Sequence, residues 1–161
     1  MNTRDIARSL TTLFAELVDG APQTGAYMLN RGDSGLLQSL DKLDAAAASR
    51  ITGSGSSIAA HVDHLRYGLS LLNRWAGGEN PWAQADWTAS WRKTSVSDSE
   101  WKELRAGIRD EARRWLDVMS RPREVDALEL NGIVGSIAHL AYHLGAIRQI
   151  LAACGKYVPT K

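Results

Sequence analysis

The four histidines of this chain fall into two close pairs whose spacing suits a metal site. His61 and His64 are three residues apart, and His139 and His143 are four residues apart. On a helix, residues three or four apart share a face, with about 5–6 Å between their Cβ atoms. Two stacked histidines on one helix and one on a facing helix can reach a single ion such as Zn²⁺. A three-histidine set leaves coordination positions open for water or substrate, as a catalytic metal site requires.

Spacing alone leaves open which histidine of the first pair is the third ligand. On a helical wheel, His64 lies on the flank of the apolar face together with Gly68, whereas His61 lies deeper within that face. If His64 is the ligand, His61 could be a fourth ligand, a group that supports a ligand, or a base. The alternative without a metal is that these side chains are hydrogen-bonded core residues.

Apolar residues recur with the helical period along most of the chain. Asp33 or Ser34 can cap a short helix, Ser57 is an N-cap for a long one, and Ser97 with Glu100 matches a capping box. No segment alternates in the manner of a strand. The pattern therefore predicts an all-α protein, a four-helix bundle with an extra short helix in its long first crossover. The expected long helices cover about residues 6–17, 58–76, 98–121 and 130–153, and the short one about 36–47.

Composition limits the class of protein. The chain has 161 residues, which predicts one domain over 1–161, and 19 basic against 18 acidic side chains give a net charge of +1. So small a charge argues against strong binding to nucleic acid or to anionic membranes. The single cysteine, Cys154, and a start without a signal-peptide pattern predict a cytoplasmic protein. The apolar stretch 133–153 contains two His, an Arg and a Gln, so we expect a buried helix there rather than a membrane span.

A tryptophan-rich connection follows the first histidine-bearing helix, with Trp82, Trp87 and Trp91 between residues 78 and 96. Loops of this length are usually functional or packed on the body of the protein. The connection could be a lid over the metal cleft, or a loop that its aromatic side chains anchor to the helices. Other candidates are three arginines that could hold a substrate carboxylate and two acids that could orient a ligand histidine, namely Arg66, Arg74, Arg148, Asp63 and Glu79.

Two segments resemble the DinB/YfiT-like family. Residues 132–150 look like that family's closing helix, in which two histidines separated by three residues are followed, one residue later, by glycine. Residues 57–65 look like its second-helix motif, in which a histidine follows a Ser or Thr cap by about seven residues. The resemblance implies an up-down-down-up four-helix bundle. It also implies that His64, His139 and His143 bind a divalent ion, which is zinc, nickel or iron in that family.

The resemblance further implies a thiol-dependent transferase or isomerase that uses a small thiol such as mycothiol, bacillithiol or glutathione. A small-molecule substrate is the expected partner, a homodimer is allowed, and His61 is the expected catalytic proton carrier. Two features depart from the family pattern, namely Ala146, where Gln is frequent, and the extra His61. The alternatives are a metal-dependent hydrolase, a non-enzymatic metal- or ligand-binding stress-response module, and a helical dimerisation scaffold.

Overall fold

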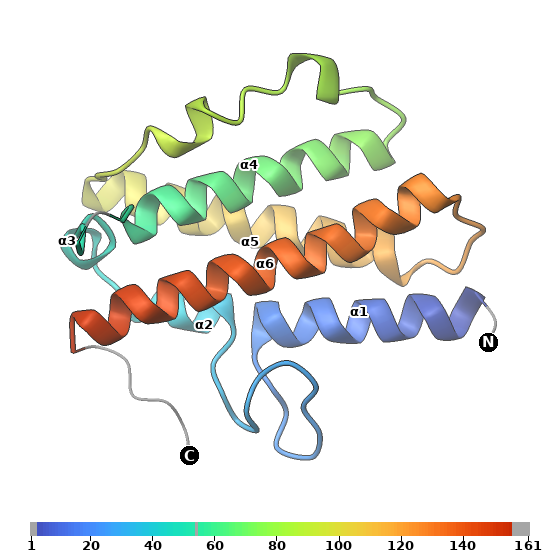
Figure 1. The fold of residues 1–161 in the computed structure, drawn as a ribbon, viewed down its shortest axis with the longest axis horizontal. Coiled ribbons are helices and arrows are strands. Elements are labelled where there is room, and N and C mark those ends of the chain that lie inside the picture. Colours follow the sequence, from blue (N-terminus) through green and yellow to red (C-terminus); the bar gives the residue numbers. More distant parts are fainter. Residues whose placement is uncertain (1–2, 54, 156–161) are drawn as a thin grey trace.

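The computed structural model describes residues 3–53 and 55–155, and over these residues the protein is helical (Figure 1). A lone antiparallel bridge between Gly20 and Ser34 is the one β-type pairing among the described residues. The expected all-α class is therefore confirmed. The elements are α1 Thr3–Asp19, α2 Leu36–Asp41, α3 Ala45–Ala48, α4 Ile58–Ala76, the 3₁₀ turns η1 Trp82–Gln84 and η2 Ala89–Trp91, α5 Asp98–Ser120, and α6 Ala127–Ala153.

Side-chain caps define where the long helices begin. Ser57 accepts a hydrogen bond from the Ala60 N–H at the start of α4, and Ser97 forms the expected capping box with Glu100 at the start of α5. Helix α6 begins at Ala127, earlier than the apolar pattern predicts, because Asp126 accepts from the third N–H of the helix. Caps of this kind satisfy backbone donors that a helix leaves unpaired at its start.

The short-helix prediction was wrong in detail. The segment 36–47 is not one helix but the two pieces α2 and α3, whose N-caps are Gly35 and Asp44. Neither Asp33 nor Ser34 caps α2, and Gly35 offers no side-chain bond there. Asp33 and the Ser34 carbonyl instead accept hydrogen bonds from Arg148 of α6, at 3.3 and 2.8 Å. The Ser34 hydroxyl accepts from Lys42 Nζ at 3.0 Å, so both side chains that the local pattern assigned to capping have partners elsewhere.

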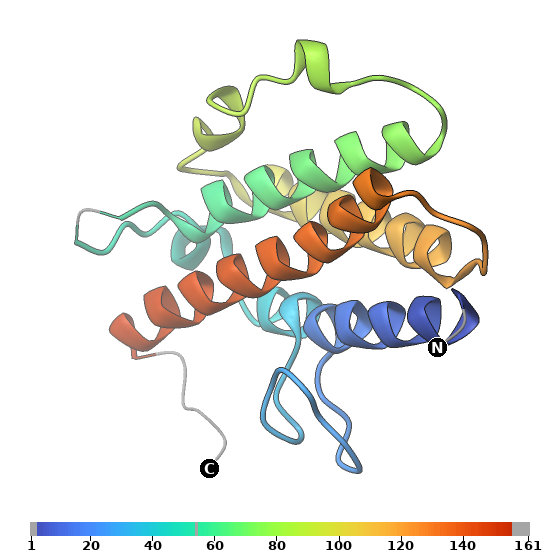
Figure 2. The same ribbon diagram turned by 45° about the vertical axis from the view of Figure 1, so that its right-hand side comes forward.

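The four long helices pack in pairs. Helix α4 contacts both α5 and α6, and α1 contacts the same two helices (Figures 1 and 2). Two buried tryptophans of α5 tie this arrangement together. Trp115 donates from Nε1 to Ser136 Oγ of α6 at 2.9 Å, and Trp101 donates from Nε1 to the Leu43 carbonyl at 2.8 Å. These bonds join α5 to α6 and to the connection between α2 and α3.

Helix α6 contains the long apolar stretch of the sequence. Its buried face includes Ile137, Leu140, Leu144 and Ile147, and His143 lies on the same face. Among the helices of residues 3–53 and 55–155, none is long and apolar enough to cross a bilayer.

A buried carboxylate organises the loop after α1. Glu16 is 4% exposed and accepts hydrogen bonds from three consecutive backbone N–H groups, those of Tyr27, Met28 and Leu29. Burial raises the pKa of Glu16, but the bonds from Leu29, Met28 and Tyr27 together outweigh it, so the pKa is lowered overall. The loop is therefore held to α1 by an internal anion.

Replacing Glu16 with Gln is expected to lower the free energy of unfolding by about 1–3 kcal/mol at pH 7, because an amide N–H would face backbone donors. The lowered pKa means that the carboxylate stabilises the fold above its unfolded pKa, and that this stability is lost as the pH falls through the folded value. The difference between wild type and variant should therefore shrink below about pH 4 in urea titrations. Glu103→Gln, at an exposed position of α5, is the matched control. An equal loss in both variants would contradict the prediction.

Candidate metal centre

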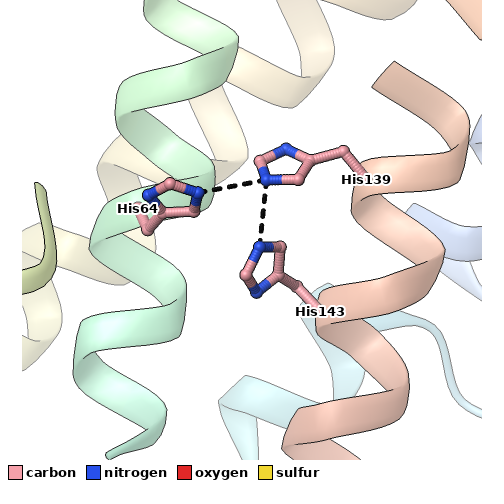
Figure 3. A group of neighbouring side chains, drawn as sticks. All are labelled: His64, His139 and His143. Carbon is pink, nitrogen blue, oxygen red and sulfur yellow. Dashed lines mark hydrogen bonds between the residues drawn. The ribbon is translucent and has the colours of Figure 1, made fainter. Parts of the chain in front are cut away.

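Three histidines from α4 and α6 converge in the interior (Figure 3). Nε2 of His139 lies 3.1 Å from Nε2 of His64 and 3.0 Å from Nε2 of His143. One nitrogen from each ring lies within 4.8 Å of the others. His64 and His143 are buried, and His139 is partly buried. The structure thus brings together the residues that spacing and resemblance had selected.

Helix geometry explains this convergence. His139 and His143 are one turn apart on α6, so their rings meet on one face, edge to face with centroids 4.5 Å apart. His64 reaches them from α4, which packs directly against α6. Gly68, one turn after His64, faces the His139 ring, and a Cβ placed there would lie 3.7 Å from His139 Cε1, an ordinary contact distance. His64 and His139, which this packing brings together, are 75 positions apart in the sequence.

Ser90 of η2 fixes the tautomer of His64. The Ser90 hydroxyl donates to the Trp87 carbonyl at 2.7 Å, so its oxygen remains to accept from His64 Nδ1 at 2.8 Å. His64 therefore carries its proton on Nδ1, and the lone pair of its Nε2 faces His139. Buried support of this kind is typical of metal-binding histidines. The sequence reasoning missed Ser90, and its only signal was a hydroxyl residue beside Trp91 in a loop already suspected of covering the site.

Replacing Ser90 with Ala is expected to weaken zinc binding by about 10- to 100-fold, because His64 loses the partner that orients it. The matched control is Ser70→Ala, since the Ser70 hydroxyl also donates to a carbonyl three residues earlier, that of Tyr67. Competition with a chromophoric zinc chelator gives both affinities. Equal affinities in the two variants would show that Ser90 does not support the site.

His61 joins the cluster from the other side of His143. The two Nδ1 atoms are 2.8 Å apart, which requires one of them to carry the proton. If Nε2 of His143 is to offer a lone pair beside His139, then Nδ1 of His143 must hold the proton and donate it to His61. His61 is then the acceptor that sets the tautomer of His143, as Ser90 sets that of His64.

The electrostatics keep these rings neutral. Burial, followed by the charges that His139 and His61 would carry, lowers the pKa of His64 to about 4, against an opposing effect of Asp63. Burial and then the neighbouring histidines lower the pKa of His143 to about 3. Burial also lowers the pKa of His61 and of His139. At neutral pH the cluster therefore presents uncharged imidazoles, the form that binds metal.

The donor set fits a divalent ion. Nε2 of His139 lies close to Nε2 of His64 and to Nε2 of His143. If His139 carries a proton on Nε2, it can donate that proton well to only one of the two, so the lone pair of the other nitrogen has no hydrogen to accept. Zinc bonds of about 2.0–2.1 Å at tetrahedral angles place ligand nitrogens about 3.3 Å apart, a few tenths of an ångström beyond the observed 3.0 and 3.1 Å. The donors of His64 and His143 lie within 4.8 Å of each other, so rotations that draw these two rings together would accommodate a metal in place of the shared proton.

The aromatic connection lies over the cluster. Trp91 stacks on His64, with ring centroids 4.4 Å apart and planes at 25°, and packs edge-on against His61 at 5.2 Å. Trp82 contacts Trp75, and Trp87 contacts Tyr67. The aromatic side chains therefore anchor this connection to α4 while Trp91 covers two of the histidines. The two roles expected as alternatives, a cover over the site and a loop anchored to the helices, therefore occur together in this connection.

The arginine and acid candidates are engaged elsewhere. Arg66 pairs with Asp63 at 2.8 Å, and Arg74 pairs with Glu79 at 2.7 Å. Arg148 pairs with the Asp33 carboxylate, which secures the loop before α2. Asp63 and Glu79 thus pair with arginines, and the observed partners of the ring nitrogens in the cluster are Ser90 and other histidines.

The chain matches no protein-family model, no curated protein and no solved structure. The resemblance to the DinB/YfiT-like proteins therefore rests on the two short histidine-bearing motifs alone. The class of protein that fold and site define is an all-helical protein with a buried three-histidine group that could bind a metal.

Proposed function

We propose that this protein binds a divalent metal ion, zinc, nickel or iron, through His64, His139 and His143. The observation that carries the proposal is the convergence of three histidine rings, with one nitrogen from each within 4.8 Å of the others and separations of 3.0 and 3.1 Å from Nε2 of His139. Three protein ligands leave coordination positions for a substrate, which distinguishes a catalytic metal centre from a closed structural one.

The finer fold assignment belongs to the same proposal. Helices α1, α4, α5 and α6 would form one up-down-down-up bundle of the DinB/YfiT-like type. Its support is the pairwise packing of the four helices and the long connection that carries α2 and α3 between α1 and α4. The two histidine motifs then occupy the second and fourth long helices, as the resemblance implies.

The proposed activity is thiol-dependent transfer or isomerisation. A bound divalent ion would supply Lewis acidity that lowers the pKa of a small thiol and favours its thiolate. Trp91 excludes water from one side of the cluster, and Ser90 holds His64 in the tautomer that exposes its Nε2 lone pair. Of the roles open to His61, its contact with Nδ1 of His143 supports the positioning of a ligand. A proton carried on Nε2 of His61 would also allow it to act as a proton donor.

The test is cobalt substitution followed by a panel of thiols. Protein loaded with Co²⁺ should show a visible absorption spectrum that changes when mycothiol, bacillithiol, glutathione or coenzyme A binds. The same loaded protein should accelerate conjugation of that thiol with an electrophile, and His143→Ala should abolish both effects. No Co²⁺ uptake by wild type would overturn the metal site. Uptake without a spectral change for any thiol would overturn thiol chemistry and favour a metal-dependent hydrolase or a non-enzymatic metal-binding module.

A further inference from the structure

A cavity of about 280 Å³ opens beside the histidine cluster, between α4, α6 and the aromatic connection. His64 and His139 form part of its wall, so a molecule bound there would lie next to the proposed metal centre. His61 and His143 are not part of the lining. The cavity approaches the size of pockets that hold small organic ligands.

The walls of this cavity are aromatic and aliphatic. Trp82 and Trp87 stand at its edge, and three leucines of α4 contribute apolar surface. Among the described residues, no Asp, Glu, Lys or Arg lines it. The hydroxyl proton of Ser136, also in the lining, is already donated to the Ile133 carbonyl at 2.7 Å. Such a wall offers contact to an apolar group and no countercharge to an anion.

The two edge tryptophans are exposed although they are large and apolar. Trp82 is 38% exposed and Trp87 is 41% exposed. Exposed apolar surface that borders a cavity is typical of a binding site. Trp82, Leu72 and Gly132 also line a neighbouring open groove of about 480 Å³, so the cavity continues to the protein surface. A ligand therefore has a route of entry along α4.

Glycines keep the cavity open at a cost to the helices. A Cβ placed at Gly68 would lie 3.5 Å from Trp87 Cζ3 and 3.7 Å from His139 Cε1, both ordinary contact distances. Alanine would therefore fit at this position, and in a helix interior it is favoured over glycine. Gly135 likewise has nothing within 4 Å of such a Cβ. By contrast, Gly132 is required by packing, because a Cβ there would meet Trp75 at 2.8 Å. Packing therefore does not explain the glycine at 68, which leaves a space between Trp87 and His139.

From this geometry we infer that the cavity binds the apolar part of an uncharged substrate, an aromatic or branched hydrocarbon group, beside His64 and His139. The role of the bound group as a substrate rests on the proposed function, because the reaction would take place at the histidine cluster beside it. The binding itself requires only the cavity. In the metal-free protein an anionic ligand is disfavoured, because burial of a carboxylate between Trp82 and Trp87 would go uncompensated.

The experiment uses two fluorinated probes that share one ring, 4-fluorobenzyl alcohol and 4-fluorobenzoate. Fluorine NMR titration of the full chain in its metal-free form should show saturable binding of the alcohol, with the benzoate at least about 10-fold weaker. Gly68→Ala should weaken binding of the alcohol by about 10-fold, since the added methyl group fills the space between the two rings. Gly145→Ala is the matched control, because Gly145 is an exposed glycine of α6 outside the cavity with nothing within 4 Å of its Cβ. It should leave the affinity unchanged.

A second variant guards against an indirect effect of Gly68→Ala. Trp82 is partly exposed and lies at the cavity edge, so Trp82→Ala should keep the fold and weaken binding of the alcohol by about 5-fold. Circular dichroism confirms folding of each variant. Equal or tighter binding of the benzoate, or an unchanged affinity in both variants, would overturn the inference.

Metal loading separates this inference from the proposed function. In protein loaded with Co²⁺, the fluorine signal of the bound alcohol should relax faster, because the cavity shares His64 and His139 with the proposed centre. If the protein takes up no Co²⁺ but still binds the alcohol in a Gly68-dependent manner, the proposed function fails and the binding site stands. If Co²⁺ binds and the alcohol does not, the metal centre stands and the substrate class is wrong.

Discussion

Replacing His139 or His143 with alanine is expected to lower zinc affinity by more than about 100-fold, beyond the effect of losing a supporting hydrogen bond. The reason is geometric. Nε2 of His139 lies at the centre of the cluster, 3.1 and 3.0 Å from its two neighbours, and His143 is its partner one turn away on α6. Wild-type protein should bind close to one Zn²⁺ per chain. Isothermal calorimetry, with elemental analysis of the purified protein, measures both quantities.

The first histidine pair provides an internal control. His64→Ala should abolish tight binding in the same way, whereas His61→Ala should weaken it only by about 10- to 100-fold, because His61 contacts Nδ1 of His143 and not the shared Nε2 point. The reverse result would make His61 the ligand on α4. Retention of full affinity by both His139→Ala and His143→Ala would show that the cluster is a hydrogen-bonded core without a metal.

Saturating zinc is expected to stabilise the fold by about 4 kcal/mol at a free concentration of about 1,000 times Kd, because the unfolded chain does not hold the three rings together. For a protein of this size, that free energy corresponds to a rise in Tm of roughly 8–16 °C. The observation behind this expectation is that two helices already hold the donors near the separations zinc needs. Differential scanning calorimetry with and without zinc measures the shift.

Two controls make the shift specific. His139→Ala should show no rise in Tm with zinc, since the central nitrogen is gone. Magnesium prefers oxygen ligands and should not raise the Tm of wild type. A chelator should return the zinc-loaded protein to the metal-free Tm. A comparable rise in His139→Ala would place the zinc outside the cluster and contradict the assignment.

Local information in the sequence accounts for the helices and for the candidate histidines. The four long helices follow from apolar periodicity, and the caps at Ser57 and Ser97 are side chains that bond to backbone groups within the next few residues. The contact between His139 and His143 follows from a spacing of four on one helix. These features depend only on neighbours along the chain, so they can be predicted before the helices pack.

Tertiary packing decided the rest. That His64 meets His139 depends on how α4 and α6 pack, a contact across 75 residues that no local pattern contains. The pairing of Arg148 with Asp33 has the same origin, because a long-range ion pair there competes with a local cap.

Ser90 shows why the supporting residues of the site could not be read from the sequence. A serine in a loop has no periodicity, and its value arises only when the loop docks and its oxygen meets Nδ1 of His64. The cavity beside Trp87 is likewise a space between elements rather than a property of any one of them. The sequence by itself therefore determined the helices and the donors they carry, whereas the packing of those helices and the docking of the loop decided which donors meet and what surrounds them.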